Sequence, residues 1–142
     1  MWHVYPKHED VLFCEGPYFT VEWYCTENGR MPALEYYQEM PEIDQHKLKL
    51  LVEYMANNPY STRLPMSKYR IEDRDNKIFA FKPRAERFFN FTAEGATLII
   101  TNAYHKHSQQ MSRQDLEELR IAVRYRQDYL RRVREGTYYE AS

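Results

Sequence analysis

Long apolar segments are missing from this sequence. No run of eighteen or more apolar residues occurs, whereas a membrane-spanning helix needs about 20. The first eight residues also lack the apolar stretch of a secretory signal peptide. We therefore expect no membrane partner and a cytoplasmic location.

Cysteine is scarce, and no pattern of metal ligands surrounds it. Cys14 and Cys25 are eleven positions apart and have no cysteine or histidine neighbour at the spacing of a zinc site. Without a signal peptide, both thiols are expected to be reduced. Ser108 lacks the glycine-flanked turn of a hydrolase nucleophile. The sequence thus predicts neither a metal nor another cofactor.

Length and composition suit one compact domain. The 142 residues are 43% hydrophobic and 15% aromatic, which is enough apolar material for a core. Internal repeats and low-complexity tracts are lacking. We divide the chain into an N-terminal extension (1–16), a single domain (17–134) and a C-terminal tail (135–142).

The net charge of −1 conceals an uneven distribution of charge. Residues 1–62 carry four Lys/Arg against ten Asp/Glu, whereas residues 63–134 carry sixteen against nine. A basic half behind an acidic half is typical of proteins with an anionic partner. Charge alone leaves open the alternative that both halves fold together and their charges mix on one surface.

Hydrophobic periodicity predicts helices packed on one face of a small antiparallel sheet, an α+β fold. The expected elements are a strand at 18–25, a helix hairpin at 32–40 and 42–56, a loop at 60–76, strands at 78–81, 87–91 and 97–101, and a long helix from Ser112. Short connections make the last three strands an antiparallel meander.

Both longer helices are expected to bury an apolar face. In the helix at 42–56, the residues that share this face are Ile43, Leu50, Leu51, Tyr54 and Met55. In the final helix, a stripe flanked by arginines is formed by Leu116, Leu119, Val123, Leu130 and Val133. Ser112 and Asp115 match a capping box, which fixes the start of this helix.

Chemically active side chains gather around the predicted meander. They are Lys82, Arg84 and Arg87 between its first two strands, and Tyr104, His105, Lys106 and His107 after its third. Because the second strand begins where the third ends, both groups should meet in one cleft. Such a cleft suits metal-free RNA cleavage, with imidazole as base or acid, cations at the phosphate and an aromatic ring beneath a base. Composition alone favours the simpler interpretation that these cations are solvated surface groups.

Three motifs follow one another at regular spacing in this half of the chain. They are Ile78-Phe79-Ala80-Phe81-Lys82, Glu86-Arg87-Phe88-Phe89-Asn90-Phe91, and Ala103-Tyr104-His105-Lys106-His107-Ser108-Gln109-Gln110-Met111-Ser112. With the turn at 94–95 and the strand at 98–101, they resemble the RelE/ParE superfamily of bacterial toxins, in particular its phage-derived HigB-like branch. The resemblance covers about residues 17–130, including the order of strand, helix hairpin, meander and final helix.

The resemblance implies a RelE-like fold and the toxin of a type II toxin–antitoxin module. Such a toxin cleaves mRNA, often on the ribosome, forms 2′,3′-cyclic phosphate ends and is silenced by a cognate antitoxin, here of the helix-turn-helix type. Lys82 and Arg87 would then neutralise the scissile phosphate, while Lys106 and His107 would supply acid–base chemistry. Proximity adds Arg84, Tyr104 and His105 as RNA-binding residues. The alternative function is non-catalytic binding of a protein target such as gyrase, or of nucleic acid.

Overall fold

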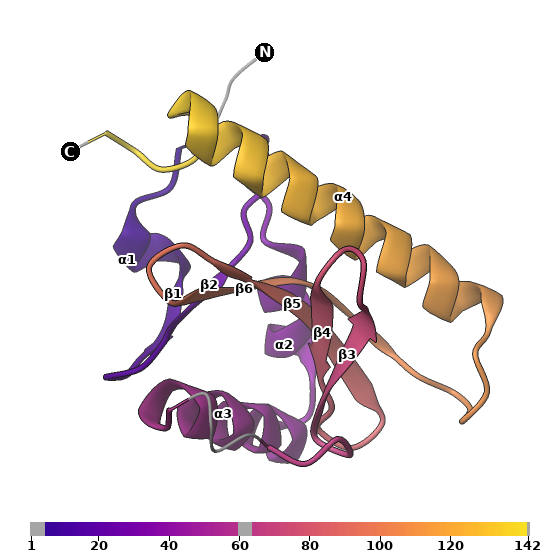
Figure 1. Ribbon diagram of the computed structural model, residues 1–142. Coiled ribbons are helices and arrows are strands. Elements are labelled where there is room, and N and C mark those ends of the chain that lie inside the picture. Colours follow the sequence, from indigo (N-terminus) through magenta and orange to yellow (C-terminus); the bar gives the residue numbers. More distant parts are fainter. Residues whose placement is uncertain (1–4, 60–63, 142) are drawn as a thin grey trace.

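A computed structural model describes residues 5–59 and 64–141 (Figure 1). Its helices are α1 (His8–Val11), α2 (Pro32–Glu39), α3 (Glu42–Asn57) and α4 (Arg113–Glu135). Its strands are β1 (Leu12–Glu15), β2 (Thr20–Trp23), β3 (Tyr69–Asp73), β4 (Ile78–Phe81), β5 (Glu86–Ala93) and β6 (Thr97–His105). The α+β class, the two successive helices at 32–57, the meander β4–β6 and the long C-terminal helix are confirmed. Along the described ranges, no helix is both long and apolar enough to cross a membrane.

The sheet is larger than predicted and is mixed. In the described part of the chain it has six strands in the order β1-β2-β6-β5-β4-β3. β2 runs parallel to β6, while the other neighbouring strands are antiparallel. The prediction of a wholly antiparallel sheet was therefore wrong. Two helices and three strands separate β2 from β6 along the chain, so no short turn forces these two strands to run antiparallel.

Both edge strands come from segments whose strand pattern is weaker than that of the central strands. β1 lies within the predicted N-terminal extension, and β3 lies within the predicted loop at 60–76, of which residues 60–63 are outside the described residues. The loop prediction was wrong for 69–73. Tyr69 and Ile71 alternate there with two charged residues, which is the period of a strand.

Helices cover both faces of the sheet, not one as predicted. Figure 1 shows α4 along one face, with α2 and α3 against the other. The central strands accordingly bury side chains in both directions. On β5, Phe91 packs edge-to-face with Tyr129 of α4, whereas Phe88 packs edge-to-face with Tyr36 of α2. The sheet is thus the middle layer of three, which leaves its strand ends as the open rim.

The face of α3 that enters the core differs from the predicted one. Three of the five expected residues are exposed instead, namely Ile43 (59%), Leu50 (53%) and Tyr54 (40%). The buried residues of α3 are Leu48, Val52, Met55 and Ala56. These follow helical spacing as well as the predicted set, so periodicity alone did not decide which apolar face the sheet covers.

Helix α4 begins and ends as its sequence dictates, but it is rotated relative to the prediction. Ser112 and Asp115 form the expected capping box, and Gly136 closes the helix in the left-handed conformation (φ 74°). The buried positions are Asp115, Ala122, Tyr129 and Arg132. The predicted stripe lies at their flank, so Leu116 and Val133 remain exposed.

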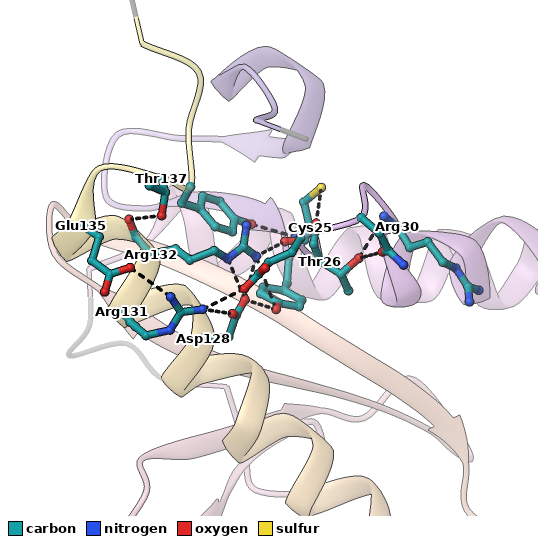
Figure 2. A network of polar contacts seen from close by, with 12 residues as sticks. Cys25, Thr26, Arg30, Asp128, Arg131, Arg132, Glu135 and Thr137 are labelled. Carbon is teal, nitrogen blue, oxygen red and sulfur yellow. Dashed lines mark hydrogen bonds and ion pairs between the residues drawn. The ribbon is translucent and has the colours of Figure 1, made fainter. Parts of the chain in front are cut away.

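A buried arginine joins the end of α4 to the residues after β2 (Figure 2). Arg132 is 3% exposed, and its Nε donates to Asp128 at 2.8 Å while another nitrogen donates to the carbonyl oxygen of Cys25. Its guanidinium also lies 4.6 Å from the ring centroid of Tyr138. Tyr138, within the predicted tail, is fully buried, and its hydroxyl oxygen accepts from the Cys25 N–H. The residues after α4 therefore complete the core.

Candidate functional site

The ends of four strands meet at one rim of the sheet. Antiparallel pairing places Tyr69 of β3 beside Phe81 of β4, Phe81 beside Phe88 of β5, and Arg87 beside Tyr104 of β6. The loop after β6 then leads into α4, whose first turn lies over this rim (Figure 1). Side chains from distant parts of the sequence consequently converge there.

A pocket of about 140 Å³ opens at this rim, on the α4 face of the sheet. It is lined by the predicted residues Arg87, Tyr104 and Lys106. The other lining residues lie outside the predicted site and are Arg70, Glu72, Phe89, Gln109, Met111, Asp115 and Leu119. The structure therefore brings part of both predicted groups together, as the meander required.

Arg87 is the pocket cation whose charge is least compensated. Its guanidinium donates to the backbone carbonyls of Arg84 (3.1 Å) and Glu86 (2.9 Å), which orient it. No carboxylate among the described residues forms an ion pair with it. The other two pocket cations are paired, Arg70 with Glu72 at 3.1 Å and Lys106 with its own acidic partner.

Lys82 lies next to these cations without lining the pocket itself. Its Nζ donates to the carbonyl oxygen of Met66 at 3.3 Å. Burial lowers the pKa of Lys82, and the positive charges of Arg70 and Arg87 lower it further. A lysine in such surroundings exchanges its proton nearer to neutral pH than a solvated lysine does.

Asp115 ties Lys106 to the start of α4. Its carboxylate accepts from the Lys106 ammonium at 2.6 Å, from the Ser112 backbone N–H at 2.7 Å and from the Tyr104 hydroxyl. Burial acts to raise the pKa of Asp115, but these hydrogen bonds outweigh it and hold the pKa far below its ordinary value. Burial and the same carboxylate raise the pKa of Tyr104, so its phenol stays protonated.

Replacing Asp115 by asparagine is expected to lower the free energy of unfolding at pH 7 by about 1.5–3 kcal/mol, because hydrogen bonds to a charged acceptor are lost. The folded-state pKa is depressed, so this stabilisation is present above the unfolded-state pKa of about 3.9 and disappears as the pH falls toward the folded-state value. Urea unfolding should therefore show a gap at pH 7 that narrows below about pH 4.

The exposed Asp75 in the β3–β4 turn provides the matched control for this measurement. An Asp75→Asn variant should follow the wild type at both pH values. A gap for Asp115→Asn that is equally large in acid would contradict the assigned role of its charge.

The remaining predicted residues face the opposite side of the sheet or lie beside it. Nδ1 of His105 is 2.8 Å from the carboxylate of Glu86, which also accepts from Tyr36 of α2. The ring of His107 packs edge-to-face on that of His105, with centroids 4.9 Å apart. Arg84 pairs with Asp44 of α3 at 3.2 Å. Alternation along β6 thus places His105 on the face opposite the pocket that holds Lys106, and His107 packs against His105 outside the pocket.

No family model and no curated protein matches this chain. What the pocket can bind therefore follows from its own chemistry. The Arg87 guanidinium fork shares the pocket with the Lys106 ammonium, and the Lys82 ammonium lies nearby, so the pocket favours an oxyanion such as a phosphate group. The described residues contain no group of three or more His, Cys, Asp or Glu side chains placed to hold a metal ion.

Proposed function

We propose that this protein is a toxin of the RelE/ParE superfamily, of its phage-derived HigB-like branch, and acts as a metal-free endoribonuclease on mRNA. The observation that carries the proposal is the uncompensated Arg87 guanidinium in a pocket shared with Lys106 and Tyr104. All three lie in the motifs on which the resemblance rests. The order of strand, helix hairpin, meander and long helix agrees with it.

The pocket groups, together with the neighbouring Lys82, suit in-line transfer of a phosphodiester. In this reaction the RNA 2′-oxygen forms a bond to phosphorus, the bond from phosphorus to the 5′-oxygen breaks, and a 2′,3′-cyclic phosphate results. Arg87 would stabilise the charge that develops on the phosphate oxygens. Lys82, whose pKa is lowered, would accept the 2′-hydroxyl proton in its neutral form, and the Lys106 ammonium would protonate the leaving 5′-oxygen.

The proposed partners follow from this activity. The substrate would be mRNA, engaged on the ribosome, and a cognate antitoxin of the helix-turn-helix type would keep the enzyme silent. No cofactor enters the reaction as written, because lysine and arginine side chains provide the proton transfer and the charge stabilisation.

Expression of the chain without an antitoxin is expected to arrest bacterial growth. Purified protein added to translating ribosomes should cut mRNA and leave 2′,3′-cyclic phosphate and 5′-hydroxyl ends, which end-specific ligation and primer extension detect. Intact mRNA with and without ribosomes, together with normal growth, would eliminate the enzyme hypothesis.

A second candidate is a non-catalytic protein of the same fold that binds a protein target such as gyrase. Two observations favour this candidate because each takes a group away from acid–base catalysis. Lys106 is held in an ion pair with Asp115, and His105 and His107 lie outside the pocket. Stalled topoisomerase complexes without RNA fragments would support this candidate, whereas RNA fragments with cyclic ends would support the endoribonuclease.

A further inference from the structure

An apolar groove runs along the flank of α4 that the sheet leaves uncovered. It encloses about 520 Å³ between α4 and the turn that joins β3 to β4. In Figure 1 this turn reaches up beside α4. Leu116, Leu119 and Val123 supply the aliphatic surface of the groove, and Leu116 is 43% exposed.

The spacing of these three residues matches a known mode of peptide recognition. They stand at positions i, i+3 and i+7 of one helix, so they form a straight apolar ridge. Two helices pack by interdigitating such ridges, and amphipathic helices dock into grooves of this kind through anchors at the same spacing. An apolar helix face therefore complements this surface in shape and in polarity.

The rim of the groove is positively charged and uncompensated. Arg120 and Arg124 line it, both are exposed, and neither forms an ion pair with a described carboxylate. The acidic residue of the rim, Asp73, is held by the backbone N–H of Asn76 at 3.0 Å and by its side-chain amide at 2.9 Å. Arg131, farther along the same helix, is by contrast bound to three carboxylates.

From these features we propose that the groove is a docking site for an acidic amphipathic helix of a partner protein. Leucine-like side chains of this helix cover Leu116, Leu119 and Val123, and its carboxylates pair with Arg120 and Arg124. Unpaired nucleic acid is disfavoured as the occupant because the described residues that line the groove include no aromatic side chain to stack a base. A charged rim around an aliphatic centre instead has the anatomy of a protein interface.

The groove adjoins the candidate site, since Leu119 lines both. A helix that extends from the groove past the first turn of α4 would lie across the pocket that contains Arg87. Docking would then exclude RNA from the pocket. This consequence rests on the proposed endoribonuclease function, whereas the docking itself does not.

The test uses a labelled synthetic peptide of roughly 18 residues, about five helical turns, with leucines along one face and glutamates elsewhere. Fluorescence anisotropy should show saturable binding to the full chain. A double variant, Arg120→Glu with Arg124→Glu, should bind at least about tenfold more weakly. Lys47→Glu with Lys49→Glu makes the same change of net charge at exposed residues of α3, on the other face of the sheet, and should bind like the wild type.

Three results would overturn the docking proposal. The first is the absence of peptide binding, and the second is equal weakening by both double variants, which would indicate attraction to net charge alone. The third is an oligouridylate probe, instead of the peptide, that loses affinity only in the Arg120/Arg124 variant. RNA cleavage is measured on the same proteins without peptide, so a failure of the proposed function is seen independently of peptide binding.

Discussion

An Arg87→Ala variant is expected to cleave RNA about 10²- to 10³-fold more slowly than the wild type and to lose growth arrest. This is the magnitude found when a donor that stabilises developing charge is removed from an enclosed site. Among the described residues Arg87 is the pocket cation without a carboxylate partner, whereas Arg70 and Lys106 are each paired with an acidic side chain. Single-turnover cleavage of a short mRNA on ribosomes measures the effect.

Two further variants separate charge from geometry at this position. Arg87→Lys keeps the positive charge but loses the planar fork that grips two phosphate oxygens, so its rate should fall between those of alanine and arginine. Arg134→Ala removes an exposed arginine at the C-terminal end of α4, which does not line the pocket, and should cleave normally. An Arg87→Ala protein that folds and retains full activity would remove the pocket as the catalytic site.

The largest loss of stability is expected from Arg132→Ala, about 3–5 kcal/mol in the free energy of unfolding. Arg132 is almost fully buried, and its removal takes the donor of the Cys25 carbonyl and the buried ion-pair partner of Asp128 (Figure 2). Asp128 would keep the Tyr24 hydroxyl and the partly exposed Arg131, whose ion pair solvent screens. Urea unfolding at neutral pH gives the difference directly.

The neighbouring Arg131 is the natural control, because it binds the same aspartate at 3.0 Å from the outside. Its side chain is 44% exposed, and solvent screens its three ion pairs. Arg131→Ala should therefore unfold close to the wild-type urea midpoint. Equal losses in both variants would show that burial does not determine the contribution of this network.

Local signals predicted the central strands and the three longer helices of the fold, but not the edge strand β3. The meander follows from alternating residues and short turns, and the capping box at Ser112 and Asp115 placed the start of α4 correctly. The rotations of α3 and α4 were not predictable in this way. Arg132 is buried because Cys25 and Tyr138, both outside its helix, satisfy its guanidinium, and no pattern within the helix reveals such partners.

The candidate site was predictable where strand pairing is local. Arg87 meets Tyr104 because one turn joins β5 to β6. The separation of His105 from Lys106 was also predictable, because successive residues of a strand point to opposite faces of the sheet. Arg70 and Glu72 were not predicted as site residues because β3 was not predicted as a strand. Its apolar and charged residues do alternate, but the pattern is short and charged and turn-forming residues flank it on both sides.

The parallel pairing of β2 with β6 has a consequence for how quickly this chain can fold. It joins Thr20 to Thr97 in the interior of the sheet, so a long loop must close before these strands gain their hydrogen bonds. Hairpins such as β5–β6 form within microseconds, whereas topologies that depend on distant pairings fold in milliseconds to seconds. The rim that carries the candidate site belongs to the local meander, so it can assemble before β1 and β2 join the sheet.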